Sequence, residues 1–527
     1  MRKLGIFLGF TPKQLVPHEG IARLIGFIVK GALSAEGVSV TIAGPSWLKS
    51  EIQALLEDAK VPSGFVKIVT TRGEPFIVRL WKLSERFRRA KAKPKQKKNR
   101  IKRAALKVSS LAVYWLSTTS TTLFLAGAIL VAALAVIFAI PAILTLILLV
   151  CTYAIKRALP RLSRYRAFRH LMREISEFNL EFKRKVRTLR IVDRVQDREL
   201  KRLVSKLNRR ADTDVWYVPS MFWPQVAGLT GKVVMAAPDI VFYEHPGQYT
   251  SSDFEGSLDR ITGSIAAADH LICYSEYVRS HHLVERQQVP AERVSVIRHG
   301  SIDTREVEAG TGDRQSALDV LHTYLNANQH RLPAYLNGFS FDDVDFLFYS
   351  SQARPHKNIE GLITVYEKIL REHFRPVKLV LTAKFDTQSR IRELITKHGL
   401  ENDVLSLSSV PNHVLAALYR LARLSVTPTM FEGGFPFTFS EAYSVGTPSV
   451  MSRIPVVTEV IQDQFLLDQM TFDPRDRKEM LEKILWGIDN RDLLLKQQLP
   501  LFETLQLRSW TNVADEYIAL IRKVAGE

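Results

Sequence analysis

The sequence predicts an α/β protein in which two Rossmann-like domains face one another across a ligand cleft. Two stretches in which short apolar strands alternate with amphipathic helices, one in each half of the chain, predict two parallel sheets. An uncharged run of 48 residues between Lys107 and Lys156 interrupts the first stretch and predicts an inserted transmembrane or re-entrant helical hairpin. A chain of 527 residues is long enough for two or three domains.

The first alternation predicts an amino-terminal domain formed by residues 1–81 and 211–304, on either side of the insertion. Its opening run, KLGIFLGF, is short and no small-residue cleavage site follows it, so we expect a first strand and not a signal peptide. Strands are expected to begin near residues 3, 38, 64, 214, 232, 270 and 294. Helices are expected over residues 20–37, 50–60, 224–229, 261–267 and 275–286.

The second alternation predicts a carboxy-terminal domain over residues 343–509, preceded by a linker with one helix at 305–342. A last helix is expected over residues 510–527. Strands are expected over residues 344–351, 377–383, 404–410, 424–429 and 449–452. Helices are expected over residues 359–370, 389–398, 413–422 and 438–446.

Residues 82–210 form the predicted membrane insertion, with the hydrophobic hairpin at about 109–155. A spanning helix needs about 20 apolar residues, so this run suits two passes better than one. Residues 82–107 hold 13 basic side chains and one acidic, and residues 156–210 hold 19 and six. Basic flanks mark the cytoplasmic side, so the hairpin should return the chain to the side it left. The second flank has apolar residues at helical spacing, and we favour a helix on the membrane surface over one packed against the protein.

The net charge of +19 comes from these two flanks, and the rest of the chain is mildly acidic. We therefore expect contact with anionic membrane lipids and not with nucleic acid, for which no zinc-finger, helix-turn-helix or RNA-binding signature is present. Two cysteines without a Cys/His cluster exclude a disulfide framework and indicate an intracellular protein. We expect a protein of the inner (cytoplasmic) membrane with both domains on the cytoplasmic side.

The sharpest chemical signal is the segment MFEGGFPFTFSEAYSVGTP, residues 430–448, which joins a predicted strand to a predicted helix. Ligands of parallel α/β sheets bind outside the carboxyl ends of the strands. A glycine-rich turn there lets backbone N–H groups approach a ligand, and the helix N-terminus favours anionic groups. Glu432 and Glu441 can each accept hydrogen bonds from sugar hydroxyls. A structural turn with two solvated carboxylates is the alternative.

Several segments, in the same order along the chain, resemble the family 4 retaining glycosyltransferases of GT-B fold. FEGGFPFTFSEAYSVGTPSVMSRIPVVTEVI is similar to the family's E-x7-E block, and FLFYSSQARPHKNIEGLI to its phosphate-clamp segment. PHEGIARLIG resembles the family's glycine loop, with Gly20 in the turn, and KVVMAAPDIVFYEHP resembles its V-x-H-D-L-x-P segment. The resemblance covers most of the chain outside residues 82–210.

The resemblance implies metal-independent transfer of a hexose from a nucleotide-diphosphate sugar, without a cofactor. The donor is expected to be GDP-mannose or UDP-glucose, with a slight preference for GDP-mannose. Lys357, with Arg354, would neutralise the charge that develops on the departing diphosphate. Glu441 would hold the ribose and Glu432 the donor sugar. The other donor-binding residues that the resemblance implies are Gly20, Gln352, Asn358, Gly433, Gly434, Phe435 and Pro436.

Two departures from the family pattern bear on the donor site. Eight residues, where the family has seven, separate Glu432 from Glu441, which puts the role of Glu432 in question. Gln352 stands where the family often has an arginine, so we expect either that Arg354 compensates or that the phosphate clamp is weaker.

A third departure lies in the first domain, which handles the acceptor in GT-B enzymes. Pro238 replaces the histidine of the family's H-D pair, while Asp239 remains. Asp239 is therefore a catalytic candidate beside Lys357 and Glu432, and His245 is an acceptor candidate. The membrane insertion in this domain implies a lipid-linked saccharide of polysaccharide or O-antigen biosynthesis as the acceptor.

Two other patterns are set aside. The D-x-D sequences at residues 212–214 and 343–345 look like metal sites, but both precede strands, whereas metal-binding carboxylates of this kind follow them, so we expect no metal. His281 and His282, in a predicted helix, are interpreted as surface or packing residues. A catalytically inactive GT-B scaffold and a basic nucleic-acid binder remain as rival functions, and the oligomeric state is open.

Overall fold

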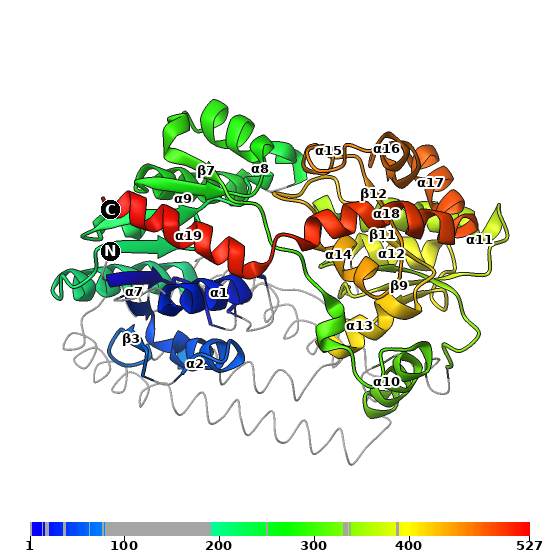
Figure 1. Ribbon diagram of the computed structural model, residues 1–527, viewed down its shortest axis with the longest axis horizontal. Coiled ribbons are helices and arrows are strands. Elements are labelled where there is room, and N and C mark those ends of the chain that lie inside the picture. Colours follow the sequence, from blue (N-terminus) through cyan, green and yellow to red (C-terminus); the bar gives the residue numbers. More distant parts are fainter. Residues whose placement is uncertain are drawn as a thin grey trace, which may run out of the picture.

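The computed structural model of the chain describes residues 3–12, 14–15, 20–34, 38–62, 64–75, 78–79, 191–248, 251–329, 332, 336, 339–385 and 389–526. They form two α/β domains, each built on one parallel sheet (Figure 1). The predicted pair of parallel α/β domains is therefore confirmed. The hairpin expected at 109–155 lies outside the described residues. Among those that are described, no helix is long and apolar enough to span a bilayer.

The first sheet has seven parallel strands in the order β3-β2-β1-β4-β5-β6-β7. The strands are apolar on both sides, as in VWYV of β4, because helices bury both faces of the sheet. Chain order reverses between β1 and β4, where Leu4 is in register with Val215. The strands are β1 (Lys3–Phe7), β2 (Ser39–Gly44), β3 (Val66–Thr70), β4 (Val215–Val218), β5 (Lys232–Ala236), β6 (His270–Cys273) and β7 (Val294–Val296).

Helices bury both faces of this sheet in separate apolar cores. One core contains side chains of α1, α2 and α19, and the other those of α7, η3 and α9. The last helix of the chain, α19, lies along the first domain and contacts α1 (Figure 1). The helical elements are α1 (Gly20–Ser34), η1 (Ser46–Leu48), α2 (Lys49–Asp58), α7 (Ile191–Asn208), η3 (Pro224–Gly228), α8 (Val241–Glu244), η4 (Pro246–Gln248), α9 (Ser251–Ala266), η5 (Val278–Arg286), η6 (Ala291–Arg293) and α19 (Trp510–Ala525).

Helix α7 corrects the expectation for the end of the second basic flank. Its apolar stripe, Leu200, Leu203, Val204 and Leu207, is buried in the first domain's core. Because this stripe contacts the sheet, it is not available to a bilayer, and the membrane-surface interpretation is wrong for α7. The described part of the first domain accordingly resumes at residue 191, before the expected 211.

The second sheet has six parallel strands in the order β10-β9-β8-β11-β12-β13. Chain order reverses between β8 and β11, where Leu424 is in register with Leu347. The strands are β8 (Phe346–Tyr349), β9 (Lys378–Leu381), β10 (Val404–Ser406), β11 (Leu424–Thr427), β12 (Ser449–Ser452) and β13 (Thr471–Phe472).

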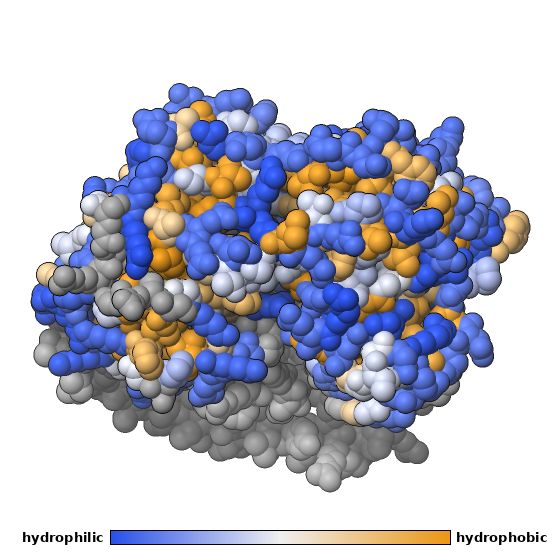
Figure 2. Space-filling model, in the orientation of Figure 1, coloured by the Kyte–Doolittle hydropathy of each residue, from blue (hydrophilic) through white to orange (hydrophobic). Residues whose placement is uncertain are grey.

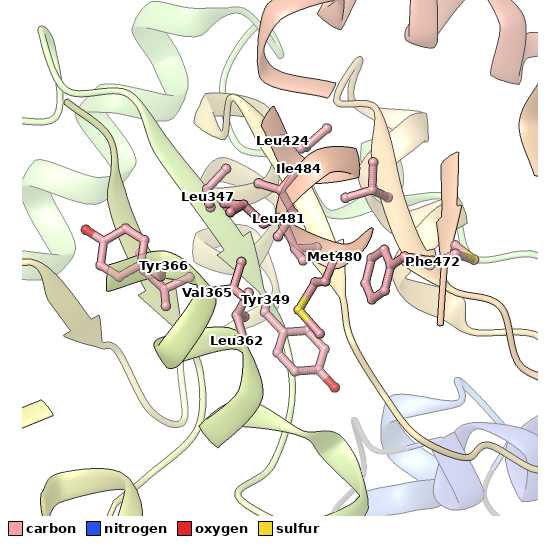
Figure 3. Close-up of a cluster of buried hydrophobic side chains, with 14 of the residues drawn as sticks. Leu347, Tyr349, Leu362, Val365, Tyr366, Leu424, Phe472, Met480, Leu481 and Ile484 are labelled. Atoms are coloured by element: carbon pink, nitrogen blue, oxygen red, sulfur yellow. The ribbon is translucent and has the colours of Figure 1, made fainter. Parts of the chain in front are cut away.

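Helices also cover both faces of the second sheet. Figure 3 shows the core on one face, where Leu362 and Tyr366 of α11 and Met480 and Ile484 of α17 gather around strand residues such as Leu347. The helical elements are η10 (Pro355–Lys357), α11 (Ile359–Arg371), α12 (Arg390–Lys397), α13 (Asn412–Leu421), α14 (Phe437–Ser444), α15 (Pro455–Thr458), α16 (Gln464–Met470), α17 (Arg477–Asp489) and α18 (Arg491–Gln506).

The segment expected to be a linker contains η7 (Thr304–Val307) and α10 (Arg314–Ala327). Leu318 and Leu321 of α10 are buried with Phe346 and Val414 on the other face of the second sheet. The helix in the expected linker is therefore part of the second domain's core.

The chain crosses between the domains twice, and the two crossings are hydrogen-bonded to each other. The Ser301 N–H donates to the Arg508 carbonyl at 3.1 Å, and the Arg508 guanidinium donates to the Arg298 carbonyl at 3.1 Å. A Cβ on Gly300 would meet Trp510 at 3.0 Å, so the crossings also approach closely. These contacts hold the carboxyl ends of the two sheets toward one another.

Candidate active site

A cleft of about 550 Å³ lies between the domains, at the carboxyl ends of both sheets. The strands at which chain order reverses, β1/β4 and β8/β11, end beside it, which is where parallel sheets bind ligands. Hydrophilic residues cover much of the face shown in Figure 2, with apolar residues in patches over both domains. The cleft is lined by Gly20, Asp239, Gln352, Arg354, Lys357, Glu432, Gly433, Gly434, Phe435, Pro436 and Glu441, all singled out from the sequence.

Lys357 and Glu432 form an ion pair inside this cleft, with Nζ and Oε1 2.5 Å apart. Lys357 is the last residue of η10, which follows β8, and Glu432 is in the loop after β11; β8 and β11 are neighbours in the sheet. The two side chains are 19% and 23% exposed, so water screens the pair less than it screens a surface pair. The pair offers a cation and a hydrogen-bond acceptor at the same place.

Asn358 does not line the cleft, although it directly follows Lys357. Its backbone is left-handed, with φ 53° and ψ 33°, a conformation that asparagine tolerates better than most residues. Its side-chain amide donates to the Pro474 carbonyl at 3.0 Å. Asn358 therefore sets the start of α11, while Lys357 beside it faces the cleft.

The glycine turn of residues 432–436 is pressed against the first domain. A Cβ on Gly433 would lie 2.1 Å from the Pro238 carbonyl oxygen, and one on Gly434 would lie 3.0 Å from the His299 ring. The Ser275 hydroxyl donates to the Gly433 carbonyl at 2.9 Å. Gly433 is required by this close approach of backbone to backbone, whereas Gly434 leaves room for the side chains of His299 and Tyr274.

The two glutamates lie on different parts of the unit that follows β11. β11 ends at Thr427 and α14 begins at Phe437, so Glu432 lies in the turn before α14 and Glu441 lies on α14 itself. Thr427 and Thr438 are joined by a 2.7 Å hydroxyl hydrogen bond. Both carboxylates consequently line the cleft in spite of the altered spacing.

Glu441 is held by Tyr419, whose hydroxyl donates to Oε2 at 2.8 Å. Burial raises the pKa of Glu441, while the Tyr419 hydrogen bond and the Arg23 charge act in the opposite direction. The carboxyl therefore faces the cleft from an environment with little water.

Asp239 lies on the opposite wall, after β5. Burial and the charge of Glu432 raise the pKa of Asp239, and His282 and Lys357 oppose them. Asp239 and Glu432, one from each domain, thus interact electrostatically across the cleft.

His245 lies outside the lining of the cleft. Its side chain is buried, and burial lowers its pKa. Its Nε2 has no hydrogen-bond partner among the described residues. His245, the acceptor candidate, therefore does not line the cleft.

Sequence reasoning missed an aromatic group on the cleft wall, formed by Tyr274, His299 and Trp510. The Tyr274 and His299 rings are 4.0 Å apart between centroids, and burial lowers the pKa of His299 to about 3. His299 is part of the RHG sequence that follows β7, which was the one available signal. Trp510 reaches the cleft only because α19 returns to the first domain.

The two D-x-D sequences precede β4 and β8, as predicted, and so lie at the opposite edges of the sheets from the cleft. Asp212 pairs with Lys67 at 2.7 Å, and Asp214 accepts the Lys3 N–H at 3.0 Å. Among the described residues there is no group of three or more His, Cys, Asp or Glu side chains placed to hold a metal. His282 is fully buried, in agreement with a packing role.

Residues 338–498 match the family model described as glycosyl transferases group 1. Over 193 residues the chain is 26% identical to an uncharacterized glycosyltransferase of Methanocaldococcus jannaschii, a match that covers 35% of this chain and 46% of that protein. Over 146 residues it is 29% identical to the O-antigen chain mannosyltransferase B of Escherichia coli, covering 28% and 37%. A third relative, the MMP alpha-(1->4)-mannosyltransferase of Mycolicibacterium hassiacum, is 26% identical over 170 residues, covering 32% and 40%. The matches span less than half the length of each relative.

Several solved structures resemble almost the whole chain. The Anabaena HepE protein, crystallised with UDP and glucose, has a TM-score of 0.56 and 13% identity, with 99% of this chain and 100% of that chain covered. A glycosyltransferase from Rickettsia africae has a TM-score of 0.53 and 11% identity, with 99% and 98% covered. The chain therefore has a GT-B-like fold, and its second domain carries a glycosyl transferases group 1 match.

Proposed function

We propose that the chain is a membrane-associated retaining glycosyltransferase of family 4 type, which moves a hexose from a nucleotide-diphosphate sugar to a lipid-linked saccharide. The observation that carries this proposal is the Lys357–Glu432 pair, held at 2.5 Å in the cleft beside the glycine turn. A sugar diphosphate has one anionic group and several hydroxyls, and the pair supplies a partner for each.

The donor would bind mainly on the second domain. Its diphosphate would take Lys357 away from Glu432 and would also meet Arg354, while the released Glu432 carboxylate would accept a hydroxyl of the sugar. Glu441, already held by Tyr419, would accept from the ribose. Gln352 supplies a neutral amide where a second cation is common, so Lys357 carries more of the charge.

The reaction then needs no group from the protein as a nucleophile. An acceptor hydroxyl oxygen attacks the anomeric carbon, the bond from that carbon to the diphosphate oxygen breaks, and the acceptor's proton passes to the departing diphosphate. Negative charge grows on the diphosphate as the bond breaks, and Lys357 stabilises it from a fixed position with little surrounding water. Asp239, across the cleft on the first domain, would contact the donor sugar or the acceptor hydroxyl.

The names of the relatives favour particular donors and acceptors. Two of the relatives carry mannosyltransferase names, which favours GDP-mannose. The Anabaena structure holds UDP and glucose, which keeps UDP-glucose as the second donor. The O-antigen name of one relative favours a lipid-linked acceptor of polysaccharide or O-antigen biosynthesis.

Membrane association rests on the sequence alone. The uncharged run at about 109–155, bracketed by the two basic flanks, would hold the acceptor-side domain at the cytoplasmic face of the inner membrane, where anionic lipids attract the flanks.

A donor screen tests the proposal. The full chain is purified in detergent and supplied with membrane extract as acceptor and with labelled GDP-mannose, UDP-glucose and other nucleotide sugars in turn, with and without EDTA. We expect one donor to label a lipid fraction, without inhibition by EDTA, and Glu432→Gln to abolish most of the labelling. Asp403→Asn is the matched control, because Asp403 also pairs with a lysine at 2.5 Å and lies away from the cleft. Binding of a nucleotide sugar without any transfer or hydrolysis would favour the inactive scaffold.

A further inference from the structure

We propose that His282 is a positioning residue that sets the relation between the two carboxylates of the cleft, Asp239 of the first domain and Glu432 of the second. This inference rests on the proposed function for its kinetic consequence, and on the geometry of the described residues for its mechanism. His282 itself lies outside the lining of the cleft and touches neither the expected donor nor the acceptor.

The first connection runs from His282 to the Asp239 loop. The imidazole Nδ1 accepts the backbone N–H of Ile240 at 3.0 Å, and both groups are buried. A backbone N–H can only donate, so Nδ1 carries no hydrogen and the tautomer is fixed with its hydrogen on Nε2. This bond joins residues 42 positions apart and fixes the residue directly after Asp239.

The second connection holds the imidazole ring itself. Its Nε2 donates to Glu244 Oε1 at 3.0 Å, and the Tyr277 hydroxyl donates to the same oxygen at 2.8 Å. The His282 hydrogen bond is the largest of the effects that lower the pKa of Glu244 to about 2, so this carboxylate is ionised at neutral pH. A charged acceptor makes the pair of bonds stronger than neutral ones would be.

The third connection crosses to the second domain. The His282 ring lies against the Phe431 ring, with centroids 5.3 Å apart, and Phe431 directly precedes Glu432. His282 has no exposed surface, so its polar nitrogens and its ring are all engaged by these neighbours. One side chain therefore contacts the residue after Asp239 and the residue before Glu432.

The helix that carries His282 is unusual and is fixed to the second domain. η5 is a π-helix, in which the Gln287 N–H donates to the His282 carbonyl five residues back at 3.1 Å. Such helices are rare and frequently occur at functional sites. Just before η5, the Glu276 and Tyr277 N–H groups donate to the Glu459 carboxylate of the second domain at 3.0 and 2.6 Å. The segment that precedes η5, the helix of His282, is thus hydrogen-bonded to the second domain.

Two conservative variants separate the bonds that His282 makes. In His282→Asn the side-chain oxygen can replace Nδ1 and accept the Ile240 N–H. In His282→Gln the side-chain amide can replace Nε2 and donate to Glu244, but the Ile240 N–H is left buried without an acceptor. His281→Gln, on the exposed neighbour, is the matched control.

In the transfer assay we expect His282→Gln to lower kcat about 10- to 100-fold, with KM for the donor within about twofold of the wild type. We expect His282→Asn, which keeps an acceptor for the Ile240 N–H but loses the ring beside Phe431, to recover part of kcat. We expect His281→Gln to behave as the wild type. Wild-type kcat in both His282 variants would overturn the proposal. An equal loss of kcat, donor affinity and thermal stability in both would assign His282 a merely structural role and would also overturn it.

A second measurement needs no turnover. Hydrogen–deuterium exchange of the peptide around residues 237–244 should be faster in His282→Gln than in the wild type and unchanged in His282→Asn. Unchanged exchange in both variants contradicts the inference even in an active enzyme. A wild-type chain without transfer activity contradicts the proposed function, while the exchange result still decides whether His282 holds the Asp239 loop.

Discussion

Glu441 shows how burial and one hydrogen bond set the charge of a single side chain in the cleft. Burial raises the pKa of this carboxyl above its ordinary value of 4.5, and Tyr419 and Arg23 oppose the shift. In the unfolded chain the same carboxyl ionises near 4.5. The folded state therefore loses stability as the pH rises from about 4.5 through the raised pKa, and loses no more above it.

Glu441→Gln removes this titration, so we expect the variant to gain thermal stability relative to the wild type as the pH rises from about 4.5. The gain should level off above the raised pKa of the native carboxyl. The measurement is Tm at a series of pH values, with Glu503→Gln, on an exposed position of α18, as the control. A variant that becomes steadily less stable than the wild type over this range would show that burial does not dominate the environment of Glu441.

Site residues that belong to a local sequence pattern could be predicted from the sequence. Lys357, Glu432 and Glu441 belong to strand–loop–helix units that the sequence pattern predicts, and all three line the cleft. Tyr419 and His282 were not readable as site residues, because their partners lie 22 and 42 positions away and meet them only in the folded chain. Trp510 reaches the cleft through the return of α19, which no local pattern indicates.

At the scale of elements, the glycine turn before α14 determines how closely the two domains approach each other, because Gly433 lies against the Pro238 carbonyl. A methyl group on Gly433 would lie 2.1 Å from the Pro238 carbonyl oxygen, and backbone atoms cannot yield as a flexible side chain can. We expect Gly433→Ala to push the turn from the first domain and to lower kcat/KM about 10- to 100-fold. Gly247→Ala, which meets nothing within 4 Å, should keep wild-type kinetics. Wild-type activity in Gly433→Ala would mean that the domains need not approach this closely.

Helix α7 is the element for which the sequence was ambiguous. An apolar stripe beside basic residues fits both a membrane-surface helix and a packed helix, and the nearby uncharged run favoured the membrane surface. The buried contacts of Leu203 and its neighbours show that α7 is packed.

We expect Leu203→Ala to lower the free energy of unfolding by about 2 to 5 kcal/mol, because the side chain is fully buried in the first domain. Leu499→Ala, at a position 42% exposed, should change it by much less. Denaturant unfolding of the purified chain measures both. If Leu203→Ala lost vesicle binding without losing stability, the result would support the membrane-surface interpretation of α7 and contradict the packed one.

At the scale of the whole molecule, Glu459 is a contact between the domains outside the two chain crossings. Its carboxylate accepts two N–H groups just before η5, where the helix N-terminus favours an anion. Hydrogen bonds to a charged group stabilise by about 1.5 to 3 kcal/mol, enough to shift an equilibrium between open and closed domains about 10-fold or more.

Glu459→Gln should therefore increase the population of open molecules, which small-angle scattering would record as a larger radius of gyration. Glu479→Gln is the matched control, because Glu479 also accepts a backbone N–H, from Asp473, within one domain. An unchanged radius in Glu459→Gln would show that the crossings alone hold the domains together.

The two-domain arrangement was predictable, because each sheet reads as alternating strands and helices along the chain. The contacts that hold the domains against each other were not predictable, because Gly433, Glu459 and α19 meet partners that lie far away in the sequence. The predicted membrane hairpin lies outside the described residues and stays a prediction.

The most direct test of the central claim compares Lys357→Ala with Lys378→Ala in the transfer assay. Both lysines form 2.5 Å ion pairs of similar exposure, but Lys378 pairs with Asp403 at the amino end of β9, away from the cleft. If Lys357 stabilises the departing diphosphate, its loss should lower kcat/KM about 100- to 1,000-fold, while Lys378→Ala stays within about twofold of the wild type. Wild-type kcat/KM in Lys357→Ala, or an equal loss in both variants, would contradict the account.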